Sequence, residues 1–374
     1  MIEKGNSVTN KRNLNLDLIR CVAVILVISV HFLHNNEFYE NILVGKKMFL
    51  MTMIRTYSMI CVPLFLILTG YLMNRKKLEK RYYKGIIKTL LIYIIASIFC
   101  ILFKKYYLNS NVTIKTAILG IFSFKNANYS WYIEMYIGLF ILIPFLNMIY
   151  NNLKDRKDKR KLIATFMILT TLPSVLNIFK ISGQNAYDKL TIDWWKNLYP
   201  ITYYFMGAYL CEYKNQMNLK KSTNLILIIF IIILSTIFNY SRSYGKLFEK
   251  GAYVQFESLE NVLLAVMVFL FFNNLKLDRV PQIISRLIIR VSKLSLGTYL
   301  ISSIFDTIFY KKLNEQILNV PDRVKYYLLI VLTVFFCSLF TAWIMDIIAN
   351  FILKILENTR NKYKIRKETT NAIK

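Results

Sequence analysis

Long apolar runs separated by short polar segments dominate the chain. An apolar helix of about 20 residues crosses the hydrocarbon core of a bilayer, and a soluble domain rarely needs many such runs. The pattern predicts about ten transmembrane helices, at residues 14–34, 48–73, 86–103, 131–150, 162–179, 198–211, 225–240, 259–275, 287–310 and 326–353. The fold class that follows is all-α, a polytopic integral membrane helical bundle.

The sixth predicted span, 198–211, is the least regular because it is short and contains Pro200 and Gly207. If it lay along the membrane surface, every later loop would change sides. The longest connections, 104–130 and 180–197, are expected outside, and an apolar stretch in the first of them suits the membrane surface. We expect one transmembrane domain over residues 1–356 and a basic cytoplasmic tail over 357–374.

Composition agrees with a membrane protein, since 56% of the 374 residues are hydrophobic and the mean hydropathy is +0.41. The net charge of +28 would also suit a nucleic-acid-binding protein. However, the basic residues occur in short segments between apolar runs and form no separate basic domain. Anionic phospholipid surfaces explain the charge, so we expect membrane lipids and no nucleic acid among the partners.

The distribution of Lys and Arg orients the chain. With the N-terminus inside, 31 of the 49 basic residues lie in segments predicted to be cytoplasmic and 16 in segments predicted to be outside. Because Lys and Arg concentrate in cytoplasmic loops, the expected topology places both termini inside. Residues 1–16 resemble the start of a signal peptide, but the apolar stretch that follows carries Arg20 and His31 and no cleavage pattern, so we expect a retained first helix.

Cysteine spacing gives no sign of a metal site. The five cysteines lie within or at the ends of apolar runs, and none forms a metal-type pair: Cys21, Cys61, Cys100, Cys211 and Cys337. We expect unpaired buried thiols and no disulfides.

Ionisable residues inside the predicted spans are candidates for function, because a charge in hydrocarbon is costly. These residues are Arg20, His31, Arg55, Glu134, Asp306 and, as a weaker candidate, Asp346. In the first span, Arg20 and His31 are 11 residues apart, which is about three helical turns, so both lie on one face. Asp17 and His34 fall on or near the same face, which we expect to point into the bundle.

Depth suggests where four of these groups meet. In the expected topology His31, Arg55, Glu134 and Asp306 all lie in the outer third of their spans. If these four side chains converge, they form a site that opens to the outside. Structural readings stay open: packing for His31, an ion pair between Arg55 and Glu134, and solvation for Asp306.

Two other features have ordinary explanations. Arg20 lies near the cytoplasmic surface, where its side chain could reach lipid phosphates. Trp131 and Tyr132 stand at a span end, as residues of an interfacial aromatic belt do.

Four segments of the chain stand out in order. They are the Arg20–His31 pair with ten residues between, 62–72 (VPLFLILTGYL), 131–144 starting at Trp131-Tyr132, and 295–301 (SLGTYLI). Together they resemble the motifs of the acyltransferase-three family, including its Arg-x10-His signature; these are integral membrane O-acyltransferases that modify bacterial surface glycans. The resemblance covers roughly residues 14–350 and implies a transmembrane acyltransferase domain in a bacterial plasma membrane.

The chain departs from the family pattern at two places. Ser302-Ser303 follows the last motif, where many members have His, so no second catalytic histidine is expected there. After the second span many members have an Arg-rich stretch, whereas this chain has Lys84 and Lys88. Lysine keeps the charge of arginine but not its two-pronged geometry for phosphate.

The resemblance implies a reaction between acetyl-CoA, or a related acyl-CoA, on the cytoplasmic side and a hydroxyl outside. The acyl-CoA is a co-substrate, and no permanently bound cofactor is expected. Arg20, Lys84 and Lys88 are the expected cations for the CoA phosphates. His31 is the expected general base or acyl carrier, with Glu134 or Asp306 orienting it.

The remaining expectations concern the acceptor. Arg55 would stabilise an oxyanion or bind an anionic acceptor, and Tyr and Trp side chains at the outer ends would stack on sugars. The acceptor is a glycan or a glycolipid, and whether copies of the chain associate stays open. Two other function classes also stay open, a glycan or glycolipid transporter or flippase and a polytopic sensor or scaffold. The Arg20–His31 pair and the lack of an internal repeat favour the enzyme.

Overall fold

The computed structural model describes residues 12–372 apart from 182–185 and 218, with side chains described as far as residue 359. The basic segment 1–11, on which the signal-peptide comparison and part of the charge count rest, lies outside the described residues. Within the described ranges the chain is helical, with no strand and one isolated bridge between Leu43 and Tyr244.

The α-helices are α1 (Leu14–Asn35), α2 (Gly45–Ser58), α3 (Cys61–Met73), α4 (Lys80–Tyr83), α5 (Ile87–Tyr106), α6 (Ile114–Phe122), α7 (Trp131–Asn152), α8 (Arg156–Thr170), α9 (Pro173–Leu176), α10 (Tyr199–Glu212), α11 (Lys221–Ser243), α12 (Leu259–Asn273), α13 (Gln282–Gln316) and α14 (Tyr327–Ala372). Short 3-10 segments join several of them, at Phe38–Glu40, Lys84–Ile86, Trp194–Leu198, Lys214–Gln216, Ala252–Val254 and Val320–Tyr326.

The prediction of a polytopic helical membrane protein is confirmed. Eight helical segments in the described part of the chain are long and apolar enough to cross a bilayer. The fifth and sixth predicted spans fall instead on shorter helices, α8 with 15 residues and α10 with 14. Whether these two cross the membrane, and with them the count of ten, stays a prediction.

The second predicted span is divided into two helices. Helix α2 ends at Ser58 and α3 begins at Cys61, and Pro63 lies in the first turn of α3. Proline has no N–H to donate, and its ring clashes with the carbonyl four residues earlier, which here belongs to Met59. The helix therefore breaks at Met59 and Ile60, and α3 starts afresh.

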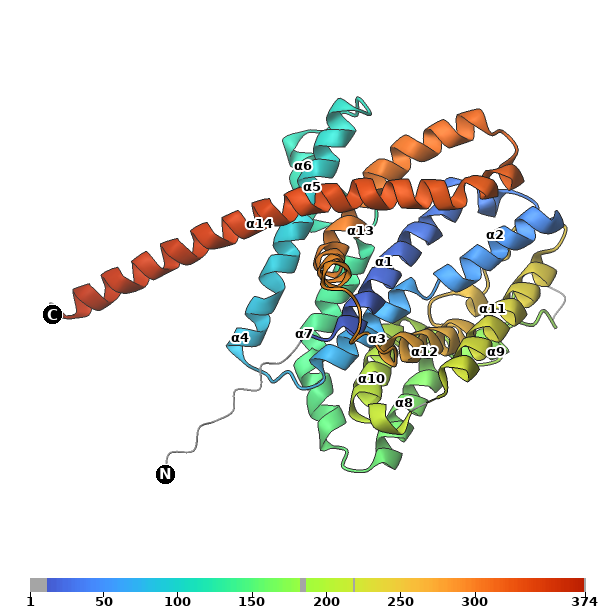
Figure 1. Ribbon diagram of the computed structural model, residues 1–374, viewed down its shortest axis with the longest axis horizontal. Coiled ribbons are helices and arrows are strands. Elements are labelled where there is room, and N and C mark those ends of the chain that lie inside the picture. The colour runs from blue at the N-terminus through green and yellow to red at the C-terminus, as the bar shows by residue number, and fades with distance from the viewer. Residues whose placement is uncertain (1–11, 182–185, 218, 373–374) are drawn as a thin grey trace.

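Helix α1 lies at the centre of the bundle and packs against α2, α3, α12, α13 and α14 (Figure 1). Its most apolar window is 72% buried, compared with 28% for α11, whose apolar side chains face outward. Asn15 ties the start of α1 to α12, because its side-chain amide donates to the backbone carbonyls of Phe272 and Leu275 at 2.8 Å each. These carbonyls lie in the last turn of α12 and just after it, where backbone acceptors can take side-chain donors.

Helices α13 and α14 are longer than the predicted spans, with 35 and 46 residues. Figure 1 shows the end of α14 running well beyond the rest of the bundle. The basic tail predicted from residue 357 continues this helix as far as Ala372.

Candidate active site

A cavity of about 1220 Å³ runs between α1, α3, α5, α7, α13 and α14. One end is bordered by the start of α1 and of α5, with Arg12, Arg20 and Lys88 in its wall. The other end is bordered by the end of α1 and the start of α7, with His34 and Trp131 in its wall. In the expected topology these ends face the cytoplasm and the outside, respectively.

The polar face predicted for α1 points into this cavity. Arg20, His31 and His34 all line it. Eleven residues of helix separate Arg20 from His31 by about 16 Å along the axis. A single helix therefore presents a cation near one end of the cavity and an imidazole toward the other.

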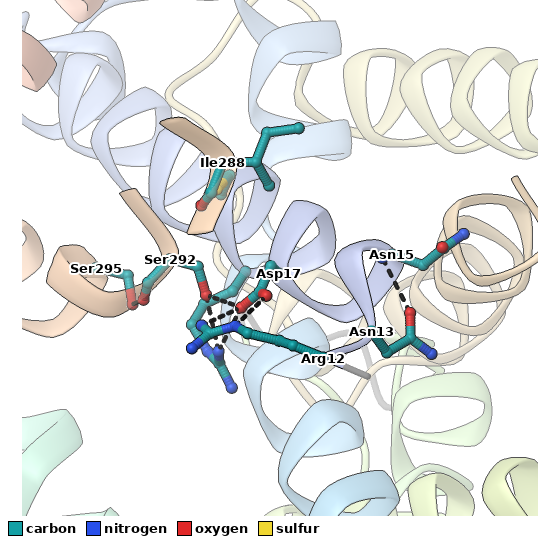
Figure 2. Close-up of polar contacts among 9 residues, drawn as sticks. Arg12, Asn13, Asn15, Asp17, Ile288, Ser292 and Ser295 are labelled. Atoms are coloured by element: carbon teal, nitrogen blue, oxygen red, sulfur yellow. Dashed lines mark hydrogen bonds and ion pairs between the residues drawn. The ribbon is translucent and has the colours of Figure 1, made fainter. Parts of the chain in front are cut away.

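Buried Asp17 organises the end of the cavity that holds Arg20. Its carboxylate accepts two hydrogen bonds from Arg12, at 2.6 and 2.7 Å, and one from the hydroxyl of Ser292 at 2.6 Å. The guanidinium of Arg20 donates to the same hydroxyl at 2.8 Å and lies 3.5 Å from Asp17. Figure 2 shows Arg12 and Ser292 converging on Asp17. The carboxylate thus fixes two arginines at one end of the cavity.

The two lysines expected to bind phosphate lie in different places. Lys88 lines the cavity, forms a 2.7 Å ion pair with Asp346 and donates to Asn350 at 3.0 Å. Lys84 is exposed and is not part of the wall. A further cation, Lys293 on α13, lines the cavity and was not singled out from the sequence. Asp346, the weakest of the candidates from the sequence, therefore forms an ion pair with Lys88.

His31 is buried beside a carboxylate. Its Nδ1 lies 3.5 Å from Oδ2 of Asp306, which is 1% exposed. This distance allows an ion pair when the imidazole is protonated, and catalytic contacts of this kind often shorten when substrate binds. Of the two carboxylates proposed from the sequence to orient His31, the structure brings Asp306 to the imidazole.

Tyr129 contacts both His31 and Asp306. Its ring stacks on the imidazole with 3.5 Å between the centroids, and its hydroxyl donates to Oδ2 of Asp306 at 2.7 Å. Asn35 donates to the same hydroxyl at 3.4 Å, and the hydroxyl of Tyr299 bonds the backbone carbonyl of Tyr129. Sequence reasoning missed Tyr129. The one available signal was its position two residues before the Trp131-Tyr132 motif.

Arg55 is buried close to the site but outside the cavity wall. Its guanidinium donates to the hydroxyl of Tyr39 at 3.0 Å and to the carbonyl of Val254 at 2.9 Å, and it lies over the ring of Phe248. The ring of Tyr39 also lies 4.9 Å from that of His34, which lines the cavity. The Nη1 of Arg55 is buried with no hydrogen-bond partner among the described residues, and a role of Arg55 toward a substrate stays a prediction.

Glu134 lies on an exposed part of α7 and is not part of the cavity wall. Its neighbour Ile133 is buried, and Trp131 and Tyr132 line the cavity. The four-group convergence expected from depth is therefore not seen for Glu134 or for Arg55. The depth of a residue in its span does not determine the direction in which its side chain points.

Ser302 and Ser303, the first departure from the family pattern, are buried in α13, and the hydroxyl of Ser303 lies 3.9 Å from the thiol of Cys100. No arrangement of three or more His, Cys, Asp or Glu side chains suited to a metal ion occurs in the described ranges.

A comparison with protein families identifies the chain. The sequence profile of the acyltransferase-3 family, described as an acyltransferase domain, matches residues 13–342. No curated protein and no solved structure matched the chain. The matched region contains Arg20, His31, Tyr129 and Asp306 and most of the cavity wall. Because this match spans well over half of the 374 residues, the chain belongs to the acyltransferase-3 family and is a multi-pass membrane acyltransferase.

Proposed function

We propose that the protein transfers an acetyl or other short acyl group from cytoplasmic acyl-CoA to a hydroxyl of a glycan outside a bacterial plasma membrane. One observation carries the proposal: a single cavity has fixed cations at one end and the His31–Asp306 pair toward the other. A donor and an acceptor that approach from opposite sides would meet at His31.

The cationic end suits the phosphates of CoA. Arg20 and Lys293 line it, and Arg20 is held in place through Asp17 and Ser292. Arginine binds phosphate through parallel N–H donors, and its position is fixed before the ligand arrives. Lys88 would join these cations by exchanging Asp346 for a phosphate.

The middle of the cavity suits the rest of the donor. Its walls there are mainly apolar, with Val27 and Val30 from α1 and Val62 and Phe65 from α3. About 16 Å separates Arg20 from His31 along α1, a span that the extended arm of CoA can cover. The thioester would then lie next to the imidazole.

The chemistry at His31 follows from its two ring nitrogens. With Nδ1 turned to Asp306, Nε2 remains to take the proton of an acceptor hydroxyl. The alkoxide oxygen forms the new C–O bond at the thioester carbonyl, the C–S bond breaks, and the proton passes from Nε2 to the departing thiolate. Asp306 stabilises the imidazolium that exists between these two proton transfers.

Labelled acetyl-CoA tests the proposal directly. Inverted membrane vesicles that contain the protein should incorporate label into alkali-releasable ester on lumenal glycan, and vesicles without it should not. Acetyl-CoA should also raise the thermal midpoint of the purified protein in detergent. A glycan transporter would export unmodified glycan and show no CoA-dependent stabilisation, and that pair of results would sink the acyltransfer proposal.

A further inference from the structure

A row of aromatic rings lines the cavity from its outer end to His31. The rings of Phe256 and Trp131 are stacked, with centroids 5.7 Å apart. Trp131 is followed by Tyr132 at 6.1 Å, Tyr299 at 5.9 Å and Tyr129 at 6.2 Å. Tyr129 in turn stacks on His31. The rings thus form a continuous wall that ends at the reactive imidazole.

This wall lies away from the cations of the cavity. Trp131 is the first residue of α7, and Phe256 lies just before the start of α12 at Leu259. In the expected topology both helices start on the outer side. Arg20 and Lys88 stand near the starts of α1 and α5, on the opposite side. The aromatic wall is therefore on the side where an external acceptor would arrive.

An interfacial belt does not account for these rings. Rings of a belt face lipid and head groups, whereas Trp131, Tyr132 and Phe256 face the cavity. Trp131 is 40% exposed. Trp194 behaves as a belt residue would, since it is 83% exposed and lies outside the cavity wall.

Apart from the imidazoles of His31 and His34, the polar side chains that line the cavity beside the aromatic wall are amides. Asn35 and Asn128 line this part of the cavity, and the one acidic residue in the described cavity wall, Asp346, lies at the other end beside Lys88. Flat apolar ring faces with a few amide groups at their edge fit a sugar, whose C–H face is apolar and whose rim carries hydroxyls. Arg55 and Lys250 lie close by, packed over the ring of Tyr39, but no Lys or Arg side chain of the described residues lines this end of the cavity.

We infer that Trp131 and Phe256 form the acceptor subsite of this enzyme, on which an uncharged sugar ring stacks with one hydroxyl directed toward His31. This inference rests on the proposed function for the identity of the reaction. The binding of the sugar itself needs no acyl donor, so it can be measured separately.

Sugar binding to the full-length protein in detergent tests the inference. The probes are neutral tetrasaccharides of glucose, N-acetylglucosamine, galactose and mannose. Their binding is measured by equilibrium dialysis and by tryptophan fluorescence. At least one should bind saturably, and Trp131→Ala should weaken it about tenfold, the loss expected when one stacking ring is removed. Trp131→Phe should bind within about threefold of the wild type, and Trp194→Ala, the matched control, should bind like the wild type.

Two results would overturn the subsite. One is no saturable binding of any of the four tetrasaccharides, and the other is binding that Trp131→Ala leaves unchanged while the variant remains folded by size-exclusion chromatography. Failure of the proposed function looks different. Trp131-dependent sugar binding without any acetyl transfer would contradict the acyltransfer reaction and support the sugar subsite.

Discussion

His31 contacts two residues that are far from it in the sequence. Asp306 approaches Nδ1 from α13, and Tyr129 covers one face of the ring from the segment before α7. The phenol also donates to the carboxylate, so the three side chains form one closed group. With one face covered and one nitrogen turned to a carboxylate, the imidazole is presented to the cavity in a fixed direction.

Asp306→Asn should lower kcat about 100-fold and leave the KM for acetyl-CoA unchanged. The amide keeps the shape of the carboxylate but cannot stabilise the imidazolium, and general acid–base catalysis contributes about 10²- to 10⁴-fold. Steady-state kinetics with labelled acetyl-CoA measures both constants. Asp346→Asn is the matched control, since Asp346 contacts Lys88 and not His31, and should change mainly the KM for the donor.

Tyr129→Phe separates the stack from the hydrogen bond. The phenyl ring keeps the contact with His31 but leaves Asp306 without the 2.7 Å donor. We expect kcat to fall about tenfold, because a hydrogen bond to a charged group contributes about 1.5–3 kcal/mol. In Tyr129→Ala, which also removes the stack on His31, kcat should fall further. Equal activity of Tyr129→Phe and wild type would show that the hydroxyl does not act on Asp306.

Residue types and spacing predicted part of this site. The 11-residue interval placed Arg20 and His31 on one face of α1, and the structure shows both in the cavity. Charge and depth within the predicted spans favoured Glu134 and Arg55, which lie outside the cavity wall. Choosing between Glu134 and Asp306 requires the rotation of α7 and α13 about their axes, which is set by packing between helices and not by hydropathy.

At the scale of elements, close contact between α3 and α10 holds one wall of the cavity. A Cβ atom added to Gly70 would lie 2.0 Å from the carbonyl oxygen of Tyr204, and one added to Gly207 would lie 2.0 Å from that of Ile67. The two backbones therefore touch at both glycines, as small residues allow in membrane helix pairs. Phe65, Leu68 and Thr69 of α3 line the cavity just beside this contact.

Gly207→Ala should destabilise the protein although alanine favours helices. The backbone of α3 blocks the added methyl group, and overpacking costs about 1–3 kcal/mol. The thermal midpoint in detergent should fall by at least about 5 °C. Gly138→Ala in α7 is the matched control, since nothing lies within 4 Å of its added Cβ. A Gly207→Ala midpoint equal to that of the control would show that the contact between α3 and α10 is not as close as described.

Hydropathy located the helices well and their ends less well. The predicted span 48–73 matches one apolar segment, Gly45–Met73, but hydropathy gave no sign of the break between α2 and α3 that Pro63 signals. It also ended the last two spans early, because α13 and α14 continue as helices into polar sequence. Hydropathy detects where lipid solvates a helix, whereas the backbone hydrogen bonds of a helix extend into water.

For the whole molecule, acyl transfer from a cytoplasmic donor to an external acceptor requires the two ends of the cavity to face opposite sides of the membrane. The Lys and Arg distribution, 31 against 16, is the basis for this orientation. The segment between α8 and α10 lies outside only if both helices cross the membrane. This crossing needs a test, because each helix is shorter than the eight long spans.

Cysteine labelling can test this topology. With both α8 and α10 crossing, Ala186→Cys in a background without the native cysteines should react in intact cells with a membrane-impermeant maleimide. Lys157→Cys, an exposed position before α8 on the predicted inner side, should react only after the membrane is opened. Protection of Ala186→Cys until the membrane is opened would leave eight crossings and place this segment in the cytoplasm.

The most direct test of the account is acetyl transfer by a His31 variant. Membranes with equal amounts of wild type, His31→Gln or His34→Gln are given labelled acetyl-CoA, and ester label on glycan is counted. His34 is the matched control, because its ring packs near Tyr39 and makes no ion pair with Asp306 in the described structure. We predict that His31→Gln loses transfer at least about 100-fold while His34→Gln retains most of it. Transfer by His31→Gln at the wild-type rate would contradict the central claim that His31 is the catalytic base.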